Sequence, residues 1–143
     1  MMKQPDEPDI GDKWDLVTHR LMIAEEDLNS AQVLMDCTQY RGANNRAYYS
    51  IYHTIDAILS IDGIAFKRHK DTLAYFNKNY IATEIFPRIL GRQIVQAEEI
   101  RHSSDYDPFY IASKEGTLKQ INTAKTLLTY AREYISQQKN SDR

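Results

Sequence analysis

Cysteine is nearly absent from this sequence, which has only Cys37 in 143 residues. A single thiol cannot form an internal disulfide, and by itself it cannot build a cysteine metal site. No apolar run approaches the ~20 residues of a membrane span, and the polar N-terminus, MMKQPDEPDIGDK, lacks the apolar core of a signal peptide. These absences predict a cytoplasmic protein that has no contact with a membrane.

A strong excess of one charge is also absent, because the formal net charge is −2. The charges are unevenly placed: residues 1–37 carry nine acidic and three basic side chains, whereas residues 38–101 carry six acidic and nine basic ones. The mildly basic middle is available to an anionic partner. It is far weaker than the basic face of a dedicated duplex-DNA binder, and such a face on a helical protein is more often simply solvated.

No segment has the alternating pattern of a β-strand, and apolar residues recur instead at the spacing of an α-helix. The first expected helix runs over about Lys13–Asp36, with Asp12 as its cap, and the second over about Asn45–Asp62, after a turn at Gly42 and a cap at Asn44 or Asn45. A short helix is expected over about Asp71–Tyr80, and a longer one from Pro87 to about Ser104–Tyr106. The last expected helix starts at a cap at Ser113, and its buried face consists of Leu118, Ile121, Ala124, Leu128, Ala131 and Ile135. Gly63 is expected to stop the second of these helices.

Four long helices joined by short turns pack most naturally as an antiparallel bundle. The sequence therefore predicts an all-α, up-and-down bundle of four to five helices over residues 12–137. A disordered acidic tail is expected over residues 1–11 and a frayed C-terminal tail over residues 138–143.

Three segments resemble, in the same order, the signature segments of the HEPN superfamily, and in particular its small stand-alone proteins. They contain NRAYYxxxH, a histidine–lysine pair ahead of a short AYF helix, and RxxxDYDP. The resemblance covers about residues 13–136, and the order of the three segments is its most specific part. It implies a bundle of four or five helices that often forms a homodimer.

The resemblance also implies a function. Many HEPN proteins are metal-independent ribonucleases, commonly the toxin of a toxin–antitoxin or defence module whose other component has a nucleotidyltransferase fold, and others only bind nucleotides or RNA. The ribonucleases carry an arginine and a histidine separated by four to six residues. Here the position after four residues from Arg101 is Tyr106, and the only histidine beyond Arg101 is its neighbour His102. The catalytic pattern is therefore not intact, and enzymatic activity stays open.

Cleavage of RNA through its 2′-hydroxyl needs a proton acceptor and a cation that stabilises the phosphorane. Arg101 can supply the cation and hold a phosphate bidentately. Tyr106, with an ordinary pKa of ~10, is a poor base at pH 7, and a helix turns His102 about 100° away from Arg101. Arg101, His102 and Tyr106 are the candidate catalytic residues, with Asp105 orienting Arg101 and Tyr106 contacting the ligand.

A purely structural role is the alternative for this cluster. Arg101 and Asp105 are four residues apart, so they can form a surface pair that contributes about 0.3–0.5 kcal/mol. However, Arg101 continues an apolar stripe formed by Leu90, Ile94 and Ala97, which predicts partial burial. A partly buried cation needs a compensating group, and either Asp105 or a bound phosphate can be that group.

Tyr49 and His53 are further candidates for ligand binding. His53 lies one turn after Tyr49 and three residues before Asp56, so a hydrogen-bonded line along the helix is expected. A structural histidine is the commoner arrangement, since no second metal ligand has the spacing that zinc requires. The neighbouring tyrosines can stack on bases, although aromatic side chains at helical spacing usually belong to a core.

The densest basic patch is KRHK at Lys67–Lys70, which can steer a polyanion if its loop is exposed. No glycine-rich phosphate loop, nucleophile–histidine spacing or di-iron carboxylate pair is present, so no cofactor or metal is expected. The sequence thus predicts RNA or nucleotide binding through Arg101–Tyr106. The alternative is a non-enzymatic helper that docks on a nucleotidyltransferase-type partner.

Overall fold

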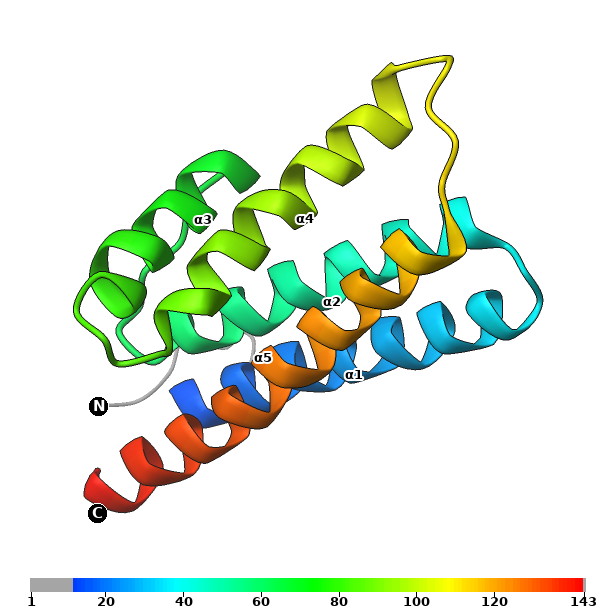
Figure 1. Cartoon of the computed structure of the whole chain (residues 1–143). Helices are drawn as coiled ribbons and strands as arrows, with labels where there is room; N and C mark the ends of the chain where they lie inside the picture. Colours follow the sequence, from blue (N-terminus) through cyan, green and yellow to red (C-terminus); the bar gives the residue numbers. More distant parts are fainter. Residues whose placement is uncertain (1–11, 143) are drawn as a thin grey trace, which may run out of the picture.

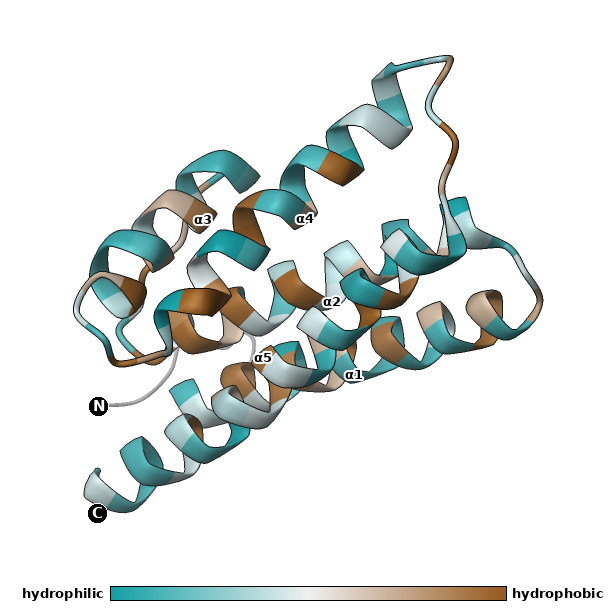
Figure 2. Cartoon of the chain, viewed as in Figure 1, coloured by the Kyte–Doolittle hydropathy of each residue, from teal (hydrophilic) through white to brown (hydrophobic). Residues whose placement is uncertain are grey.

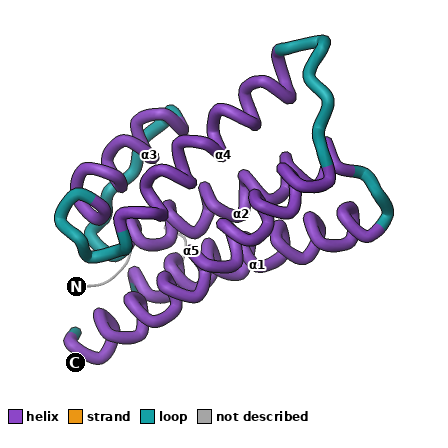
Figure 3. The backbone as a smooth tube through the Cα atoms, in the orientation of Figure 1, coloured by secondary structure: helices purple, strands orange, loops and turns teal. Residues whose placement is uncertain are grey.

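The computed structural model describes residues 12–142, and within this range the chain is helical with no β-strand (Figure 1, Figure 3). Its elements are α1 (Lys13–Asp36), α2 (Tyr40–Ser60), α3 (His69–Phe76), a π-helical turn η1 (Asn77–Ile81), α4 (Arg88–Tyr106) and α5 (Lys114–Ser141). The expected tail 1–11 lies outside the described residues.

The four long helices alternate in direction, so the predicted antiparallel all-α bundle is confirmed (Figure 1). Helix α2 is the central element and packs against α1, α3, α4 and α5. Helices α4 and α5 meet near the start of α4 and diverge toward the 107–113 connection that joins them. Because α2 touches every other α-helix, the side chains along its length meet residues from distant parts of the sequence.

The core lies around α2, and the brown inward faces of Figure 2 mark it. Ala47, Ile51, Ile55, Ile58 and Leu59, the face predicted to be buried, all have an exposed fraction of 0%. Fully burying an isoleucine or leucine side chain contributes about 1.5–3 kcal/mol. This continuous apolar face therefore holds the bundle together.

Helix α1 has the predicted bounds. The Asp12 carboxylate accepts hydrogen bonds from the backbone N–H groups of Trp14 and Asp15, and Asp15 bonds back to the Asp12 N–H in a capping box. This reciprocal pairing satisfies N–H groups that a helix start leaves without partners. Asp12 and Asp15 thus fix where α1 begins.

Helix α2 begins earlier than the sequence predicts, at Tyr40 rather than Asn45. The chain reverses over Cys37–Gln39, where Thr38 has a positive φ of 61°. Gly42 is therefore not a turn residue: it lies inside α2, where a Cβ would come within 3.2 Å of Leu34 Cδ1 on α1. The glycine lets the two helices approach closely. Gly63, with φ of 69°, does end the turn after α2 as expected.

The short middle helix is two elements rather than one, because α3 passes directly into η1. The π turn brings Ile81 against α4 at Gly91, where a Cβ would lie only 2.7 Å from Ile81 Cγ2. A wider turn of this kind shifts the side chains that follow it around the helix axis. The contact between Ile81 and Gly91 therefore allows α3 and η1 to pack beside α4.

Helix α5 starts at the predicted cap, where Ser113 Oγ accepts the Gly116 N–H at 2.9 Å. Leu118 is 44% exposed and does not belong to the buried face, on which Thr117 takes its place. The segment expected to fray from residue 138 is helical as far as Ser141. Asp142 accepts a 2.9 Å hydrogen bond from the Trp14 indole, which ties the end of α5 to the start of α1.

Candidate functional site

A polar and aromatic line runs along α2, formed by Arg46, Tyr49 and His53. Their spacing of three and four residues places them on one helical face, and all three are partly exposed. The Tyr49 hydroxyl accepts a hydrogen bond from Arg101 Nη2 of α4 at 3.4 Å. The first and third signature segments of the sequence are thus joined.

Arg101 is enclosed by α2 and by its own helix, with 24% of its side chain exposed. Its Nε lies 3.2 Å from Asp105 Oδ2, but the N–H is not aligned for a hydrogen bond to that or any other atom of residues 12–142. The guanidinium carbon is 5.4 Å from the ring centre of Tyr48 and 6.0 Å from that of Tyr49. The predicted partial burial and the Arg101–Asp105 pair are present, and the buried Nε faces Asp105.

The charge of Arg101 is maintained despite its surroundings. Burial disfavours the charge, but the hydrogen bond to Tyr49 and the proximity of Tyr48 and Asp105 outweigh it and raise the pKa of Arg101. Tyrosine faces carry negative electrostatic potential, which stabilises a cation held over them. The site therefore keeps a permanent positive charge in a half-buried position.

A second arginine, Arg46, lies beside the same tyrosine. Its guanidinium carbon is 5.0 Å from the Tyr49 ring centre, and its Nη1 donates to Asp27 Oδ1 of α1 at 3.0 Å. Arg46 and Arg101 thus both lie against Tyr49, and each has one carboxylate partner.

His53 extends this network toward α1. Its Nε2 lies 3.8 Å from Asp27 Oδ2, and its ring centre is 6.1 Å from that of Tyr49. Burial lowers the pKa of His53; Asp27 and Asp56 oppose this, while Arg46 and Arg20 reinforce it. The nearest carboxylate is that of Asp27 rather than Asp56, whose Oδ2 is 3.3 Å from Arg20 Nε. The expected hydrogen-bonded line Tyr49–His53–Asp56 is therefore not formed within residues 12–142, and the carboxylate beside His53 is that of Asp27 on α1.

His69, at the start of α3, completes the aromatic group. Its ring stacks on Tyr52 at 3.9 Å, and its Nδ1 lies 3.2 Å from the hydroxyl of the buried Tyr48. Burial raises the pKa of Tyr48, so the phenol keeps its proton. This is the one hydrogen bond of the Tyr48 hydroxyl within residues 12–142, and the hydroxyl is its donor in the His69 tautomer that carries the ring proton on Nε2. Burial, together with Arg101 and His53, lowers the pKa of His69 and keeps it neutral at pH 7.

His102 and Tyr106 lie on another face of α4. Their ring centres are 4.8 Å apart, and both side chains are exposed, Tyr106 to 68%. Among residues 12–142 no hydrogen bond or ion pair joins either of them to Arg101. The structure thus brings together Arg101, Asp105, Tyr49 and His53, and it leaves His102 and Tyr106 outside that group.

A cavity of about 460 Å³ opens beside these charges, between the start of α2 and the end of α4. Its lining includes Arg41, Arg46, Ser104 and Asp105. Arg41 Nη2 donates to the Ser104 carbonyl at 2.9 Å, while the buried Ser104 Oγ has no hydrogen-bond partner within residues 12–142. The cavity can therefore receive an anionic group next to Arg46.

A model of the HEPN domain family matches residues 17–134, most of the chain. The chain belongs to the HEPN domain family. The family predicted from the three sequence segments is confirmed.

Several curated relatives of this HEPN domain are similar to it. "Putative toxin MJ0605" of Methanocaldococcus jannaschii is 33% identical over 84 residues, which cover 59% of this chain and 63% of that protein. A "UPF0332 protein" of Thermotoga maritima is 29% identical over 105 residues, 73% of this chain and 80% of its own. "Putative toxin MJ0142" of Methanocaldococcus jannaschii is 28% identical over 112 residues, 78% and 76% of the two chains. The first alignment thus spans less than two thirds of that relative.

Two further structural observations limit the chemistry of the described residues. No three histidine, cysteine, aspartate or glutamate side chains of residues 12–142 come close enough to hold a metal ion. No helix in this range is both long and apolar enough to cross a membrane.

Sequence reasoning missed three members of the site in this HEPN domain, namely Asp27, Arg46 and His69. Arg46 and His69 stand inside the segments that carry the family resemblance, so their position in those segments was a usable signal. Asp27 had none, because nothing in an acidic stretch of α1 indicates which carboxylate faces α2.

Proposed function

We propose that this HEPN domain binds RNA and is the toxin-like component of a toxin–antitoxin or defence module. The observation that carries the proposal is the pair of guanidinium groups, Arg46 and Arg101, that flank Tyr49. Cationic groups next to exposed aromatic rings are the combination that binds single-stranded nucleic acid, because they recognise phosphate and base together. Two relatives are named putative toxins, which supports the proposed role as a toxin-like component.

Each residue of the site has a role in this proposal. The Nη groups of Arg101 hold one phosphate, and Arg46 contacts the next phosphate or the same one. Asp105 and Asp27 orient the two arginines. The partly exposed ring of Tyr49 supports a base between them, and neutral His53 lines the same edge without adding a fixed charge.

Binding is tested by fluorescence anisotropy with a labelled single-stranded RNA. Arg101→Ala and Arg46→Ala are each expected to weaken binding at least tenfold, since each removes a charge-assisted phosphate contact. Arg88→Ala is the matched control, because Arg88 lies at the start of α4 with 76% of its side chain exposed and, among residues 12–142, pairs only with Glu84. Equal affinity of the wild type and both site variants would overturn the proposal.

The same RNA, incubated in EDTA, tests for metal-independent cleavage. If the wild type cuts it, Arg101→Ala is expected to abolish cutting, because the cation stabilises the phosphorane. His102→Gln and Tyr106→Phe then test the other two candidate catalytic groups, of which Tyr106 stands where the family pattern has a histidine. A gel-filtration mass decides whether the expected homodimer, which would bring two such segments into one cleft, exists.

A protein-docking role is the second candidate, favoured by apolar side chains at the α4–α5 connection. Phe109 and Ile111 are 88% and 86% exposed, next to the exposed Tyr106. A cluster of this kind is typical of an interaction surface. Co-purification with a small nucleotidyltransferase-fold protein encoded beside this gene, lost in Phe109→Ser and kept in Arg101→Ala, would favour this role over RNA binding.

A further inference from the structure

Two adjoining cavities form a groove at the end of the bundle where α1 passes into α2. The first is the cavity of about 460 Å³ beside Arg46, and the second, of about 450 Å³, lies on α1. Leu34 lines both cavities and packs against Gly42 of α2, so we call the two together the α1–α2 groove. Tyr49 and Arg101, the centre of the candidate site, do not line this groove.

The first cavity contains the start of α2, which has no side-chain cap. Gln39 precedes the helix without capping it, and the N–H groups of Tyr40, Arg41 and Gly42 have no hydrogen-bond partner within residues 12–142. Gln39, Arg41 and Gly42 belong to the lining of the cavity. The N–H groups at the start of a helix carry partial positive charge, so this end of the groove attracts an anion.

The charged side chains of the groove do not cancel. Its lining carries two cations, Arg41 and Arg46, and one carboxylate, Asp105, which gives a formal net charge of +1. Asp105 is paired with Arg101, and Arg46 is paired with Asp27. Arg41 forms no ion pair in the described part of the chain and donates only to a backbone carbonyl. The remaining charge is therefore that of Arg41, which suits a group with a single negative charge.

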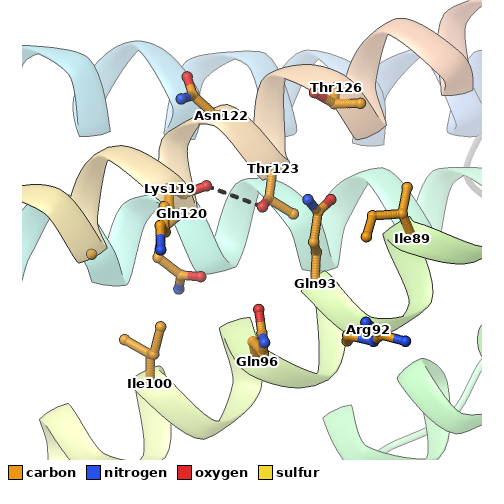
Figure 4. A pocket seen from close by; sticks show the side chains of 11 residues that line it. Ile89, Arg92, Gln93, Gln96, Ile100, Lys119, Gln120, Asn122, Thr123 and Thr126 are labelled. Carbon is orange, nitrogen blue, oxygen red and sulfur yellow. Dashed lines mark hydrogen bonds between the residues drawn. The ribbon is translucent and has the colours of Figure 1, made fainter.

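Ser104 gives a second, independent indication of a ligand. It lines the first cavity with only 5% exposed, and its Oγ has no hydrogen-bond partner among residues 12–142. A buried hydroxyl without a partner is unfavourable, and an acceptor placed in the cavity would remove that cost. The cavity of about 440 Å³ between α4 and α5 differs, because no described side chain around it has a buried polar atom without a partner (Figure 4).

The second cavity supplies an apolar surface. Val33 is 62% exposed there, beside Leu34, and no lining residue of this cavity is charged. No aromatic side chain lines either cavity, so a nucleobase would have no ring to stack on. The carboxamides of Asn29, Gln39 and Asn45 each offer a donor and an acceptor, as a peptide group does. The groove therefore suits a peptide better than the end of an RNA.

We propose that the α1–α2 groove binds the C-terminal end of a partner polypeptide whose last residues are apolar. The terminal carboxylate accepts hydrogen bonds from the N–H groups at the start of α2, from Arg41 and from the Ser104 hydroxyl. The last side chains pack on Leu34 and Val33. This surface is separate from the cluster of Phe109 and Ile111, and the proposal does not depend on RNA binding at Arg101.

Fluorescence polarisation of the full chain with labelled hexapeptides tests the proposal. The peptides carry valine next to the last position and end in leucine, isoleucine, valine or phenylalanine. Each is made with a C-terminal carboxylate and, as its matched control, with a C-terminal amide. At least one carboxylate peptide is expected to bind saturably, and its amide is expected to bind about tenfold more weakly, because the amide loses the charge-assisted hydrogen bonds.

Variants of the groove locate the binding. Arg41→Ala and Ser104→Ala are each expected to weaken binding about tenfold, and Val33→Ser about fivefold. Because the Ser104 hydroxyl has no partner among residues 12–142, Ser104→Ala should keep or raise the urea midpoint, which separates lost affinity from lost folding. Arg88→Ala and Met22→Ser, at exposed positions outside the groove, should leave the affinity unchanged.

Three results would overturn the proposal: no saturable binding by any carboxylate peptide, equal affinity for the carboxylate and the amide, or an affinity that neither Arg41→Ala nor Ser104→Ala changes. A 5′-phosphorylated single-stranded RNA is the remaining probe. If it binds in place of the peptides, and if Ser104→Ala and Val33→Ser weaken its binding, the occupant of the groove is an RNA end and the peptide proposal is wrong.

Discussion

Arg101 Nη2 donates to the Tyr49 hydroxyl at 3.4 Å, a hydrogen bond that spans 52 positions of sequence and joins α4 to α2. The arrangement depends on both helices, because the Arg101 cation is stabilised by tyrosine rings of α2 and the Tyr49 hydroxyl accepts its hydrogen bond from α4. The candidate site therefore exists only where the two helices are packed. Its properties should depend on the shape of the donor as well as on its charge.

Arg101→Lys is expected to weaken RNA binding about tenfold, although it keeps the charge. A lysine ammonium cannot bond to Tyr49, approach Asp105 and hold a phosphate in one plane as a guanidinium does. The measurement is affinity as a function of salt concentration. Arg101→Ala should also lower the slope of log affinity against log salt by about one, and an unchanged slope would mean that Arg101 does not contact phosphate.

Tyr48→Phe is expected to raise the pKa of His69 from its lowered value. In the tautomer that carries the ring proton on Nε2, His69 accepts at Nδ1 from the Tyr48 hydroxyl; this hydrogen bond stabilises the neutral ring and is lost in the variant. The variant should also lose about 1 kcal/mol of stability. Titration of the imidazole signals by NMR, with His69→Gln to assign them, measures the shift. A fall in the His69 pKa would mean that the phenol accepts a proton from the ring instead.

Stability is expected to fall as the pH drops below about 6.5. Burial lowers the pKa values of His53 and His69 in the folded state, whereas in the unfolded chain they titrate near the ordinary value of about 6.5. The unfolded state therefore binds more protons on acidification, and the stability present above this pH is lost as the pH falls through the folded pKa values.

Urea unfolding at pH 7.5 and pH 5.5 measures this loss. The double variant His53→Gln, His69→Gln should flatten the dependence, with His19→Gln, an exposed position on α1, as the matched control. If the double variant loses as much unfolding free energy between pH 7.5 and pH 5.5 as the wild type, His53 and His69 are not the cause of the pH dependence.

Gly91→Ala is expected to destabilise the fold by about 1–3 kcal/mol, because its Cβ would lie 2.7 Å from Ile81 Cγ2. Chemical denaturation gives the value. Ile81→Ala removes the clashing atom at the cost of a buried side chain, so the double variant should be less destabilised than the two single effects combined. Additive effects would show that the contact between η1 and α4 is not tight.

Much of the fold could be predicted from periodicity and caps. Asp12 and Ser113 marked helix starts correctly because capping depends on neighbouring residues alone. The start of α2 could not be predicted, because Gly42 serves a contact with α1 rather than a turn. The π turn was missed for a similar reason, since its wider winding follows from the packing of Ile81 against Gly91.

The candidate site could be predicted only in part. Arg101, Asp105 and Tyr49 were found because the apolar stripe of α4 and the family segments both pointed to them. Tyr106 was grouped with them because it stands where the family pattern has a histidine, and His102 because it is the only histidine after Arg101; the helix turns both away. Asp27 reaches the site through tertiary packing, which leaves no local pattern, whereas His69 stands in one of the family segments.

The hydrogen bond between the Trp14 indole and Asp142 gives the molecule a built-in optical reporter. The chain has a single tryptophan, so its intrinsic emission comes from one place, where the first turn of α1 meets the residue that follows α5. A red shift of that emission would register detachment of the C-terminal helix end before the core unfolds. Fusions placed after the last residue would perturb the same signal, so labels are better attached elsewhere.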